Sequence, residues 1–439
     1  GHVLDGHDFI EKAIANGAPA VVVELLPKER DEAITWIKVH DMEEALAEMA
    51  AKFFDKPSQH LTVIGITGTN GKTSTAFMTY QLLNALGRKC GMISTIDVRL
   101  GDEIHHARLT TPDVISVNRW LDKARRSGCT ELVMEASSHA LDQGRLKGVR
   151  FSYAVFTNIS HDHLDYHKDM KSYIFAKKIL FDDLQKNAKA IINKDDKRGE
   201  VMVQNTRAAV VTYSLQKLAD YKARIIDMDL NGMTLEINGM QFVTAMIGQF
   251  NVYNLLAALA IAREEGFDLN EVLQKASLLY PAEGRFEVVR DASGRTAAII
   301  DYAHTPDALK HVLSTINQIK RKKQKVITVV GCGGDRDQQK RPKMAQIASR
   351  LSDEVILTSD NPRNEEPSKI IGQMLDGLDP DEKEATLVVE DRRQAIKMAC
   401  KMRGDTDIIL IAGKGHEKYQ EIKGERLPFD DKHEVKVYL

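Results

Sequence analysis

The chain has 439 residues, too many for one ordinary hydrophobic core, so we expect two or three domains. Its 61 lysines and arginines nearly balance 63 aspartates and glutamates, and the formal net charge of −2 gives no indication of binding to nucleic acid or membrane surfaces. No uncharged apolar stretch approaches the roughly 20 residues of a membrane span, no signal peptide is visible, and four cysteines without metal-ligand or redox spacing favour a reducing cytoplasm.

Residues 1–58 are expected to form part of a small α/β domain. They contain a helical pattern around residues 9–15, an apolar strand at residues 20–23 and a second helix at residues 42–54. The chain opens at Gly1 without a methionine, and we interpret this segment as the remnant of a truncated N-terminal domain. Pro57 and Ser58 mark the expected linker to the next domain.

A second domain is predicted over residues 59–284. Short β-branched runs alternate there with amphipathic segments of helix length, which indicates a largely parallel sheet covered by helices on both faces. The predicted strands are residues 62–66, 131–134, 153–156, 190–192 and 208–211. Asn231-Gly232 and Asn238-Gly239 interrupt this rhythm and predict two hairpin turns of an antiparallel insertion, followed by a helix at about residues 252–265.

A glycine-rich turn follows the first of these strands: Gly65-Ile66-Thr67-Gly68-Thr69-Asn70-Gly71-Lys72-Thr73-Ser74. With a helix predicted at residues 76–86, it forms an anion site, because backbone N–H groups and the helix dipole point at one spot. Lys72 can reach phosphate oxygens, and the Thr73 hydroxyl can ligate Mg²⁺. The spacing departs from G-x-x-x-x-G-K-[ST], since Ile66 stands at the first glycine. A chance turn is the alternative, but the position between strand and helix favours a nucleoside triphosphate.

Candidate metal ligands follow two later strands. Glu135 ends a strand, and a carboxylate beside the phosphate loop commonly supplies a further Mg²⁺ contact, so it pairs with Thr73. A second group holds three histidines and two acids within seven residues: His161, Asp162, His163, Asp165 and His167. Its spacing suits no closed zinc site, and Mg²⁺ prefers oxygen while tolerating an occasional imidazole. The alternative for Glu135 is an ordinary charged residue at a strand end. The alternative for the histidine-rich segment is a polar loop with capping aspartates. Lys177, on a helix beginning near Asp169, would ordinarily be a solvated residue.

A third α/β domain is predicted over residues 285–439. Its predicted strands are residues 297–300, 326–330, 354–357, 386–389 and 408–411. Polar and glycine residues follow the strand ends: Asp301, Gly331, Asp360, Glu390 and Gly413. Open α/β sheets bind ligands along that edge, so two such domains facing each other predict a cleft with phosphate chemistry in the central domain.

The loops of the third domain carry side chains that would suit a zwitterion. They are Arg336, the Asp360-Asn361-Pro362-Arg363 run and Glu417. Arginine binds carboxylate through two parallel hydrogen bonds, while aspartate and glutamate bind ammonium groups. Asp301 would suit a ribose hydroxyl. This interpretation requires the loops to meet in the fold.

Taken in order, these motifs resemble the ATP-dependent Mur ligases of peptidoglycan synthesis. The resemblance rests on residues 67–73, 135–139, 158–167, 284–287 and 301–306, and it runs through nearly the whole chain. Residues 360–363 resemble the members that add meso-diaminopimelate. The departure is at the start, where the family's N-terminal domain begins earlier and contacts the uracil and ribose of a UDP-sugar.

The resemblance implies three domains: a UDP-binding domain at residues 1–58, a central ATP-binding domain at 59–284, and a Rossmann-like domain at 285–439. The implied reaction joins meso-diaminopimelate to the D-glutamate carboxylate of UDP-N-acetylmuramoyl-L-alanyl-D-glutamate. The carboxylate attacks the γ-phosphate of ATP, and the amine displaces phosphate from the resulting acyl phosphate. A monomer in the bacterial cytoplasm is expected, with no nucleic-acid or membrane partner.

The resemblance also implies roles for individual residues. ATP would contact Gly68, Thr69, Asn70, Gly71, Lys72, Thr73, Ser74, Asn251, Arg285 and Asp301. The UDP-sugar would contact Thr110, Thr111, Ser137, Gln143 and Arg145. Diaminopimelate would contact Arg336, Asp360, Asn361, Pro362, Arg363, Gly413 and Glu417. Thr73 and Glu135 would hold one Mg²⁺, and His163 with a carbamylated Lys177 would hold a second.

Two kinds of alternative remain open. Within the ligases, the chain could add lysine instead, or act on another acid, as folylpolyglutamate synthases do. From a different class, it could be a nucleotide-binding module without catalytic activity. The density of acidic and histidine residues between Glu135 and Lys177 argues against that module, since a switch needs fewer metal ligands.

Overall fold

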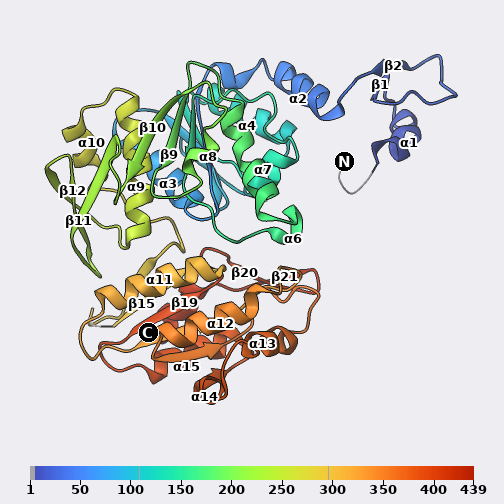
Figure 1. Ribbon diagram of the computed structural model, residues 1–439. Coiled ribbons are helices and arrows are strands. Elements are labelled where there is room, and N and C mark those ends of the chain that lie inside the picture. The colour runs from blue at the N-terminus through green and yellow to red at the C-terminus, as the bar shows by residue number, and fades with distance from the viewer. Residues whose placement is uncertain (1–4, 108, 295) are drawn as a thin grey trace.

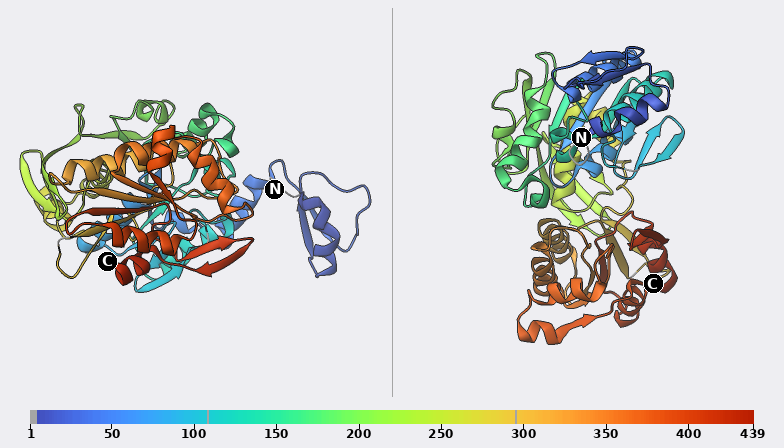
Figure 2. Two further views of the ribbon diagram at one scale, coloured as in Figure 1. Left: turned by 90° about the horizontal axis from the view of Figure 1, so that it is seen from below. Right: turned by 90° about the vertical axis from the view of Figure 1, so that its right-hand side faces the viewer.

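The computed structural model describes residues 5–107, 109–294 and 296–439, so Gly1 lies outside the described residues. Near the N-terminus, β1 (Ala20–Val23) and β2 (Thr35–Lys38) pair in parallel beside α1 (Ile10–Ala15). This small unit projects away from the rest of the molecule (Figure 2). The helices and the strand predicted in this segment are confirmed, with α2 spanning Met42–Phe53.

The predicted linker residues lie in the connection from α2 to the next strand. Pro57 and Ser58 are buried there in a short 3-10 helix (Pro57–Gln59). The Ser58 hydroxyl accepts a hydrogen bond from the Arg150 backbone N–H at 3.1 Å. This segment is therefore packed onto the central unit.

The central unit is built on an eleven-stranded sheet of order β13-β12-β11-β10-β9-β8-β3-β7-β4-β5-β6 (Figure 1). In this spatial order, the strands from β11 across to β4 run parallel. Antiparallel hairpins extend both edges, with β12 and β13 beside β11 and with β5 and β6 beside β4. Their bounds are β3 Thr62–Thr67, β4 Cys90–Ile93, β5 Asp97–Leu100, β6 Glu103–His106, β7 Glu131–Glu135, β8 Tyr153–Phe156, β9 Lys189–Asn193, β10 Ala209–Ser214, β11 Tyr221–Asp229, β12 Gly232–Ile237 and β13 Met240–Thr244. The five predicted strands and both hairpin turns are confirmed.

Helices cover both faces of this sheet. On one face, α3 (Lys72–Ala85), α9 (Gln249–Glu264) and α10 (Leu269–Ala276) enclose one apolar core. On the other, α4 (Val114–Arg126), α5 (Ser138–Asp142), α7 (Met170–Asp182) and α8 (Gly199–Met202) enclose a second. The short α6 (Leu164–His167) precedes α7. The helix predicted at residues 76–86 begins earlier, at Lys72, because Gly71 caps it directly after the phosphate loop.

The C-terminal unit is a doubly wound sheet of order β14-β15-β19-β16-β17-β18, parallel except for β14. The strands are β14 Glu287–Arg290, β15 Ala297–Asp301, β16 Val326–Val330, β17 Glu354–Leu357, β18 Thr386–Val388 and β19 Ile408–Ala412, which confirms the five predicted here. The helices are α11 (Pro306–Ile319), α12 (Lys340–Leu351) and α13 (Pro367–Leu375) on one face, α15 (Arg392–Met402) and α16 (Asp431–Tyr438) on the other, and the short α14 (Pro380–Ala385). A hairpin of β20 (Tyr419–Ile422) and β21 (Glu425–Pro428) follows β19.

A buried ion pair fixes the end of β19. Arg392 on α15 donates to both carboxylate oxygens of Asp431 on α16 at 2.7 Å, and both side chains are fully buried. The same guanidinium donates to the Ala412 carbonyl at 3.0 Å. Because Ala412 ends β19, this network holds the start of the loop that carries Gly413 and Glu417.

Among the described helices, none is both long and apolar enough to cross a membrane.

Candidate active site

The phosphate loop connects β3 to α3 and is closed by contacts from two other elements. Gly71 has φ +86°, and a Cβ there would lie 2.4 Å from Oδ1 of Asn254 on α9. Asn158, after β8, accepts from the Thr69 N–H at 2.8 Å through its carbonyl and from the Asn70 N–H at 3.0 Å through its side chain. The sequence therefore folds into the predicted cradle, and only glycine fits at position 71.

Lys72 lies inside this cradle. Its Nζ donates to the carbonyls of Gly68 and Thr69, both at 2.8 Å. Burial lowers the pKa of Lys72, while the nearby Glu135 carboxylate acts in the opposite direction. When an anion enters the loop, the Lys72 ammonium group can exchange these carbonyl acceptors for phosphate oxygens. Ser74 is buried in the first turn of α3.

Thr73 and Glu135 are brought together as predicted. The Thr73 hydroxyl donates to Glu135 Oε1 at 2.9 Å, and the Thr95 N–H donates to the same oxygen at 2.6 Å. Glu135 is only 1% exposed, and its Oε2 has no hydrogen-bond partner among the described residues. A buried carboxylate oxygen without a donor, beside a hydroxyl, is suited to a cation. Within the described part of the chain, no cluster of three or more His, Cys, Asp or Glu forms a metal site by itself.

Lys177 and His163 meet around the ring of Tyr173. Lys177 is 1% exposed, and its Nζ donates to the Gly68 carbonyl at 2.8 Å and lies 4.5 Å from the Tyr173 ring centroid. The His163 ring lies 6.2 Å from the same ring and 4.7 Å from His139. Lys177 is thus not a solvated helix residue, because its amino group reaches the phosphate loop.

Burial disfavours the charged forms of both groups. It lowers the pKa of Lys177 well below its ordinary value, and the neighbouring Lys72 adds to this effect. Burial likewise lowers the pKa of His163 to about 3, although Asp162, at 3.3 Å, opposes the shift. Both shifts favour the uncharged forms, in which an imidazole can bind a metal ion and an amine can be modified.

The five residues expected to contact a UDP-sugar lie in one connected group next to Glu135. The Thr111 hydroxyl donates to the Glu135 carbonyl at 2.7 Å, and its oxygen lies 3.2 Å from the Ser137 hydroxyl. Arg145 donates to the Thr111 carbonyl at 3.0 Å and forms a short hydrogen bond to Gln143. Thr110 accepts from the Thr95 hydroxyl at 3.1 Å. They form a polar wall beside the candidate metal pair.

Arg285 connects the central and C-terminal units. Its Nη2 donates to the Thr73 hydroxyl at 3.1 Å, and its guanidinium lies 4.4 Å from the Tyr302 ring centroid. Asp301 accepts from the Phe286 N–H at 2.6 Å, and burial raises its pKa to about 6. Asn251, on α9, donates to the Ile247 carbonyl at 2.9 Å. The residues assigned to ATP are therefore divided between the two units.

Two further contacts show that the units face each other at the phosphate loop. Asn70 donates to Asp307, at the start of α11, at 3.3 Å. His161 Nε2 lies 3.4 Å from Asp337 Oδ2 in the loop after β16. Strand ends of the C-terminal sheet are thus next to the phosphate loop, which fits the predicted cleft.

The loops expected to bind an amino acid meet at the same edge. Asn361 Nδ2 donates to Glu417 Oε2 at 2.8 Å, and a Cβ on Gly413 would lie 2.5 Å from Asp360 Oδ2. Arg363 donates to the Gly334 carbonyl at 2.8 Å, and its Nε lies 3.6 Å from Glu421. The Pro362 carbonyl packs so closely on Gly334 that a Cβ there would lie 1.9 Å away.

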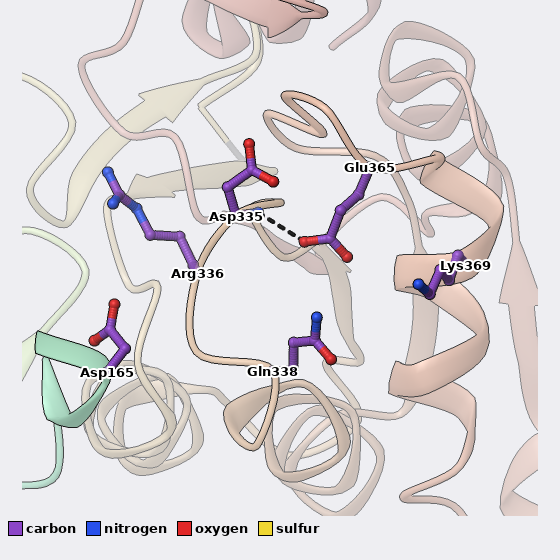
Figure 3. Close-up of a pocket in the computed structure, with 6 residues that line it drawn as sticks. All are labelled: Asp165, Asp335, Arg336, Gln338, Glu365 and Lys369. Atoms are coloured by element: carbon purple, nitrogen blue, oxygen red, sulfur yellow. Dashed lines mark hydrogen bonds between the residues drawn. The ribbon is translucent and has the colours of Figure 1, made fainter. Parts of the chain in front are cut away.

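Arg336 lines a neighbouring pocket of about 350 Å³ that includes Asp165 from the central unit (Figure 3). Its other lining residues are Asp335, Gln338, Glu365 and Lys369. Glu365 Oε1 accepts from the Asp335 N–H at 2.7 Å, shown as the dashed line. The pocket places Arg336 beside the Arg363 loop but on the side that faces the central unit.

Three supporting residues were not predicted. Asn254 closes the phosphate loop from α9. Arg341 is fully buried and donates to both oxygens of Glu365 at 2.8 Å and to the Gly333 carbonyl at 3.0 Å, which joins the Arg336 and Arg363 loops. These hydrogen bonds lower the pKa of Glu365 to about 2.

Lys414 is fully buried between Asn361 and Glu417. Its position between Gly413 and Gly415 was the one available signal in the sequence.

A phosphate loop on a mostly parallel sheet, facing a doubly wound unit with charged loops at its strand ends, places the chain in the class of α/β nucleotide-binding proteins. Residues 66–262 match the family model of the Mur ligase middle domain, and residues 284–415 match that of the Mur ligase glutamate ligase domain. Residues 1–54 match the Mur ligase family catalytic domain. The chain belongs to the Mur ligase family.

Individual relatives agree with this assignment. The UDP-N-acetylmuramoyl-L-alanyl-D-glutamate--2,6-diaminopimelate ligase of Cytophaga hutchinsonii is 51% identical over 99% of this chain and 89% of its own length. A solved structure of a ligase with the same name is 36% identical, with a TM-score of 0.69 over 98% of this chain and 88% of its own. A folylpolyglutamate synthase from Mycobacterium tuberculosis shares the fold alone, at 17% identity and a TM-score of 0.67 over 84% of this chain and 92% of its own.

Proposed function

We propose that the chain is an ATP-dependent ligase that adds meso-diaminopimelate to the D-glutamate carboxylate of UDP-N-acetylmuramoyl-L-alanyl-D-glutamate, in peptidoglycan precursor synthesis. One observation carries the proposal: Arg363, Asn361 and Glu417 converge at a sheet edge that faces the phosphate loop. The name and the near full-length similarity of the relatives support the same substrates.

The reaction needs an activated carboxylate, because a free carboxylate is a poor acyl donor. The D-glutamate carboxylate would attack the γ-phosphate of ATP, releasing ADP and forming an acyl phosphate. Lys72 and Arg285 both contact the phosphate loop and would stabilise charge on the transferring phosphoryl group. The amine of diaminopimelate would then attack the acyl carbon, release phosphate and lose a proton to give the amide.

The unpartnered Oε2 of Glu135 and the adjacent Thr73 hydroxyl fit a divalent cation. His163 and Lys177 would hold a second one, with Lys177 as its carbamate. The lowered pKa of the buried Lys177 amine favours this modification, because only an uncharged amine adds CO₂, and a protonated lysine would repel the ion. Mg²⁺ at these positions would neutralise phosphoryl oxygens.

Choice of amino acid would depend on the charges at the edge of the C-terminal sheet. Asp360 and Glu417 would bind an ammonium group, and Arg363 would bind the distal carboxylate that distinguishes diaminopimelate from lysine. Lysine would leave the Arg363 guanidinium without the substrate carboxylate that it would otherwise bind. Sites built for a polar group reject analogues lacking it by roughly 10⁴-fold or more.

An acceptor screen tests the proposal. Purified protein with ATP, Mg²⁺ and UDP-N-acetylmuramoyl-L-alanyl-D-glutamate is offered meso-diaminopimelate, lysine, D-alanyl-D-alanine or glutamate, and phosphate release is measured. We expect release to depend on the UDP-sugar dipeptide and to be fastest with meso-diaminopimelate. Preference for another acceptor would assign a different Mur-like ligase. Nucleotide binding without release would indicate a non-catalytic module. We further propose that the protein acts as a monomer in the bacterial cytoplasm.

A further inference from the structure

Lys414 is a fully buried lysine in the loop that follows β19. It lies between two glycines with positive φ, Gly413 at +114° and Gly415 at +52°. Its Nζ donates to Asn361 Oδ1 at 2.9 Å and to Glu417 Oε2 at 3.3 Å. The ring centroid of Tyr419 lies 5.6 Å from the same nitrogen. Burying a charged group costs free energy unless the group is paired, and these contacts offset that cost for the Lys414 ammonium group.

The contacts of Lys414 fix the orientation of the Asn361 amide. Asn361 Oδ1 accepts from Lys414 and also from the Glu421 N–H at 3.0 Å. With both donors at the oxygen, the Nδ2 end of the amide must point the other way, and it donates to Glu417 Oε2 at 2.8 Å. A flipped amide would place its N–H groups against two other donors.

The same lysine balances the charge of Glu417. Burial and the like charge of Asp360 raise the pKa of Glu417, while Lys414 and Asn361 oppose this shift and favour the ionised form. Both donors bond to Oε2, which leaves Oε1 for a ligand. An ammonium group binds an ionised carboxylate held in a defined position more strongly than a protonated one.

We propose that Lys414 is a positioning residue for the amino-acid site. It holds the Asn361 amide and the Glu417 carboxylate so that Glu417 Oε1 accepts an ammonium group of the incoming amino acid. This inference rests on the proposed function, since it assigns the loop to the amino-acid substrate. Lys414 acts through Asn361 and Glu417.

The first test is the substitution Lys414→Met, which keeps the apolar stem and removes the charge and the donors. The loss of hydrogen bonds to a charged group predicts that KM for meso-diaminopimelate rises roughly 10- to 100-fold. The kcat at saturating diaminopimelate and KM for ATP should change much less. Lys418→Met is the matched control, because Lys418 is in the same loop but is 60% exposed and pairs with Glu283. Equal effects of the two substitutions would overturn the inference.

A double-mutant cycle separates positioning from general stability. If Lys414 acts through Glu417, then Lys414→Met should raise KM by a much smaller factor in a Glu417→Gln background than in the wild type. An undiminished factor would overturn the inference. Lys414→Gln, which keeps a donor without the charge, serves if Lys414→Met does not fold. If neither Lys414→Met nor Lys414→Gln folds, the inference is also contradicted, because Lys414 would then be required for folding.

A crystal structure of Lys414→Met gives a readout that does not depend on the reaction. We expect the Glu417 carboxylate to leave its present position and the Asn361–Glu417 hydrogen bond to be lost. An unchanged arrangement would refute the positioning role. If wild-type protein releases no phosphate with diaminopimelate, the proposed function fails, and this structure still decides whether Lys414 holds the two side chains.

Discussion

Replacing Arg363 by methionine removes the guanidinium that we expect to bind the distal carboxylate of diaminopimelate. The Arg363 side chain is 20% exposed, and its Nη1 donates to the Gly334 carbonyl at 2.8 Å. Its backbone has φ +52° and donates to the Glu421 carbonyl at 3.0 Å. Methionine has a Cβ, as arginine has, so the backbone strain should be the same in both proteins, and the change should act through the charge.

The expected magnitude follows from the hydrogen bonds that are lost. Each hydrogen bond to a charged group contributes about 1.5–3 kcal/mol, so a bidentate guanidinium–carboxylate pair contributes about 3–6 kcal/mol. This corresponds to a loss of roughly 10²- to 10⁴-fold in kcat/KM for meso-diaminopimelate. Lysine lacks the distal carboxylate, so its kcat/KM should fall little or rise. The preference for diaminopimelate over lysine should therefore collapse by a similar factor.

Phosphate release at varied diaminopimelate or lysine, with ATP and UDP-sugar dipeptide saturating, measures both values. Arg224→Ala is a suitable control, because Arg224 is 69% exposed and pairs with Glu236 on the distant β11–β12 hairpin. KM for ATP should be unchanged in both variants. The reasoning is refuted if Arg363→Met keeps wild-type kinetics with diaminopimelate, or if it loses lysine and diaminopimelate use to the same extent.

Three further predictions concern groups around the cleft. Glu135→Gln should lower kcat by roughly 10²- to 10³-fold and raise the Mg²⁺ concentration needed for half-maximal activity. An unchanged Mg²⁺ dependence would show that Glu135 does not bind the metal ion. Native mass spectrometry in bicarbonate buffer should show one added CO₂, absent in Lys177→Met; an equal adduct in the variant would exclude Lys177. Burial raises the pKa of Asp301 from 3.8 to about 6, so between these pH values the folded state keeps a proton that the unfolded state has lost. The free energy of unfolding should therefore fall by about 2 kcal/mol as pH rises from 4 to 7. The thermal midpoint of Asp301→Asn relative to wild type should rise across that window, whereas a constant difference would refute the shift.

The positions of the parallel strands along the chain and the loops at their ends were predictable, because long β-branched runs and glycine-rich turns are strong local signals. Thr62–Thr67 and Val326–Val330 are fully or almost fully buried strands, and nearly continuous apolar runs encode them. The strands β4 to β6, which lie together at one side of the central sheet, were missed. Each has only four residues, and β6 (Glu103–His106) is largely polar, so its pairing depends on the neighbouring strand more than on its own sequence.

Within the candidate site, motif residues were predictable, but the side chains that hold them were not. Lys414 and Arg341 resemble ordinary surface residues in sequence, because charged residues are rarely fully buried. Only the fold shows that each is enclosed and bonded to residues of other loops. Lys177 was singled out solely by family resemblance, and its contact with the Gly68 carbonyl depends on the packing of α7 against β3. The domain bounds, the residue roles and the two-metal arrangement stay predictions.

The acyl-phosphate reaction is tested most directly by following the oxygen of the D-glutamate carboxylate. UDP-N-acetylmuramoyl-L-alanyl-D-glutamate labelled with ¹⁸O in that carboxylate is incubated with ATP, Mg²⁺ and meso-diaminopimelate, and both products are analysed by mass spectrometry. The account predicts that each amide formed is matched by one phosphate carrying one ¹⁸O, because the carboxylate oxygen that attacks the γ-phosphate leaves with it. Unlabelled phosphate, or phosphate release without amide formation, would contradict it.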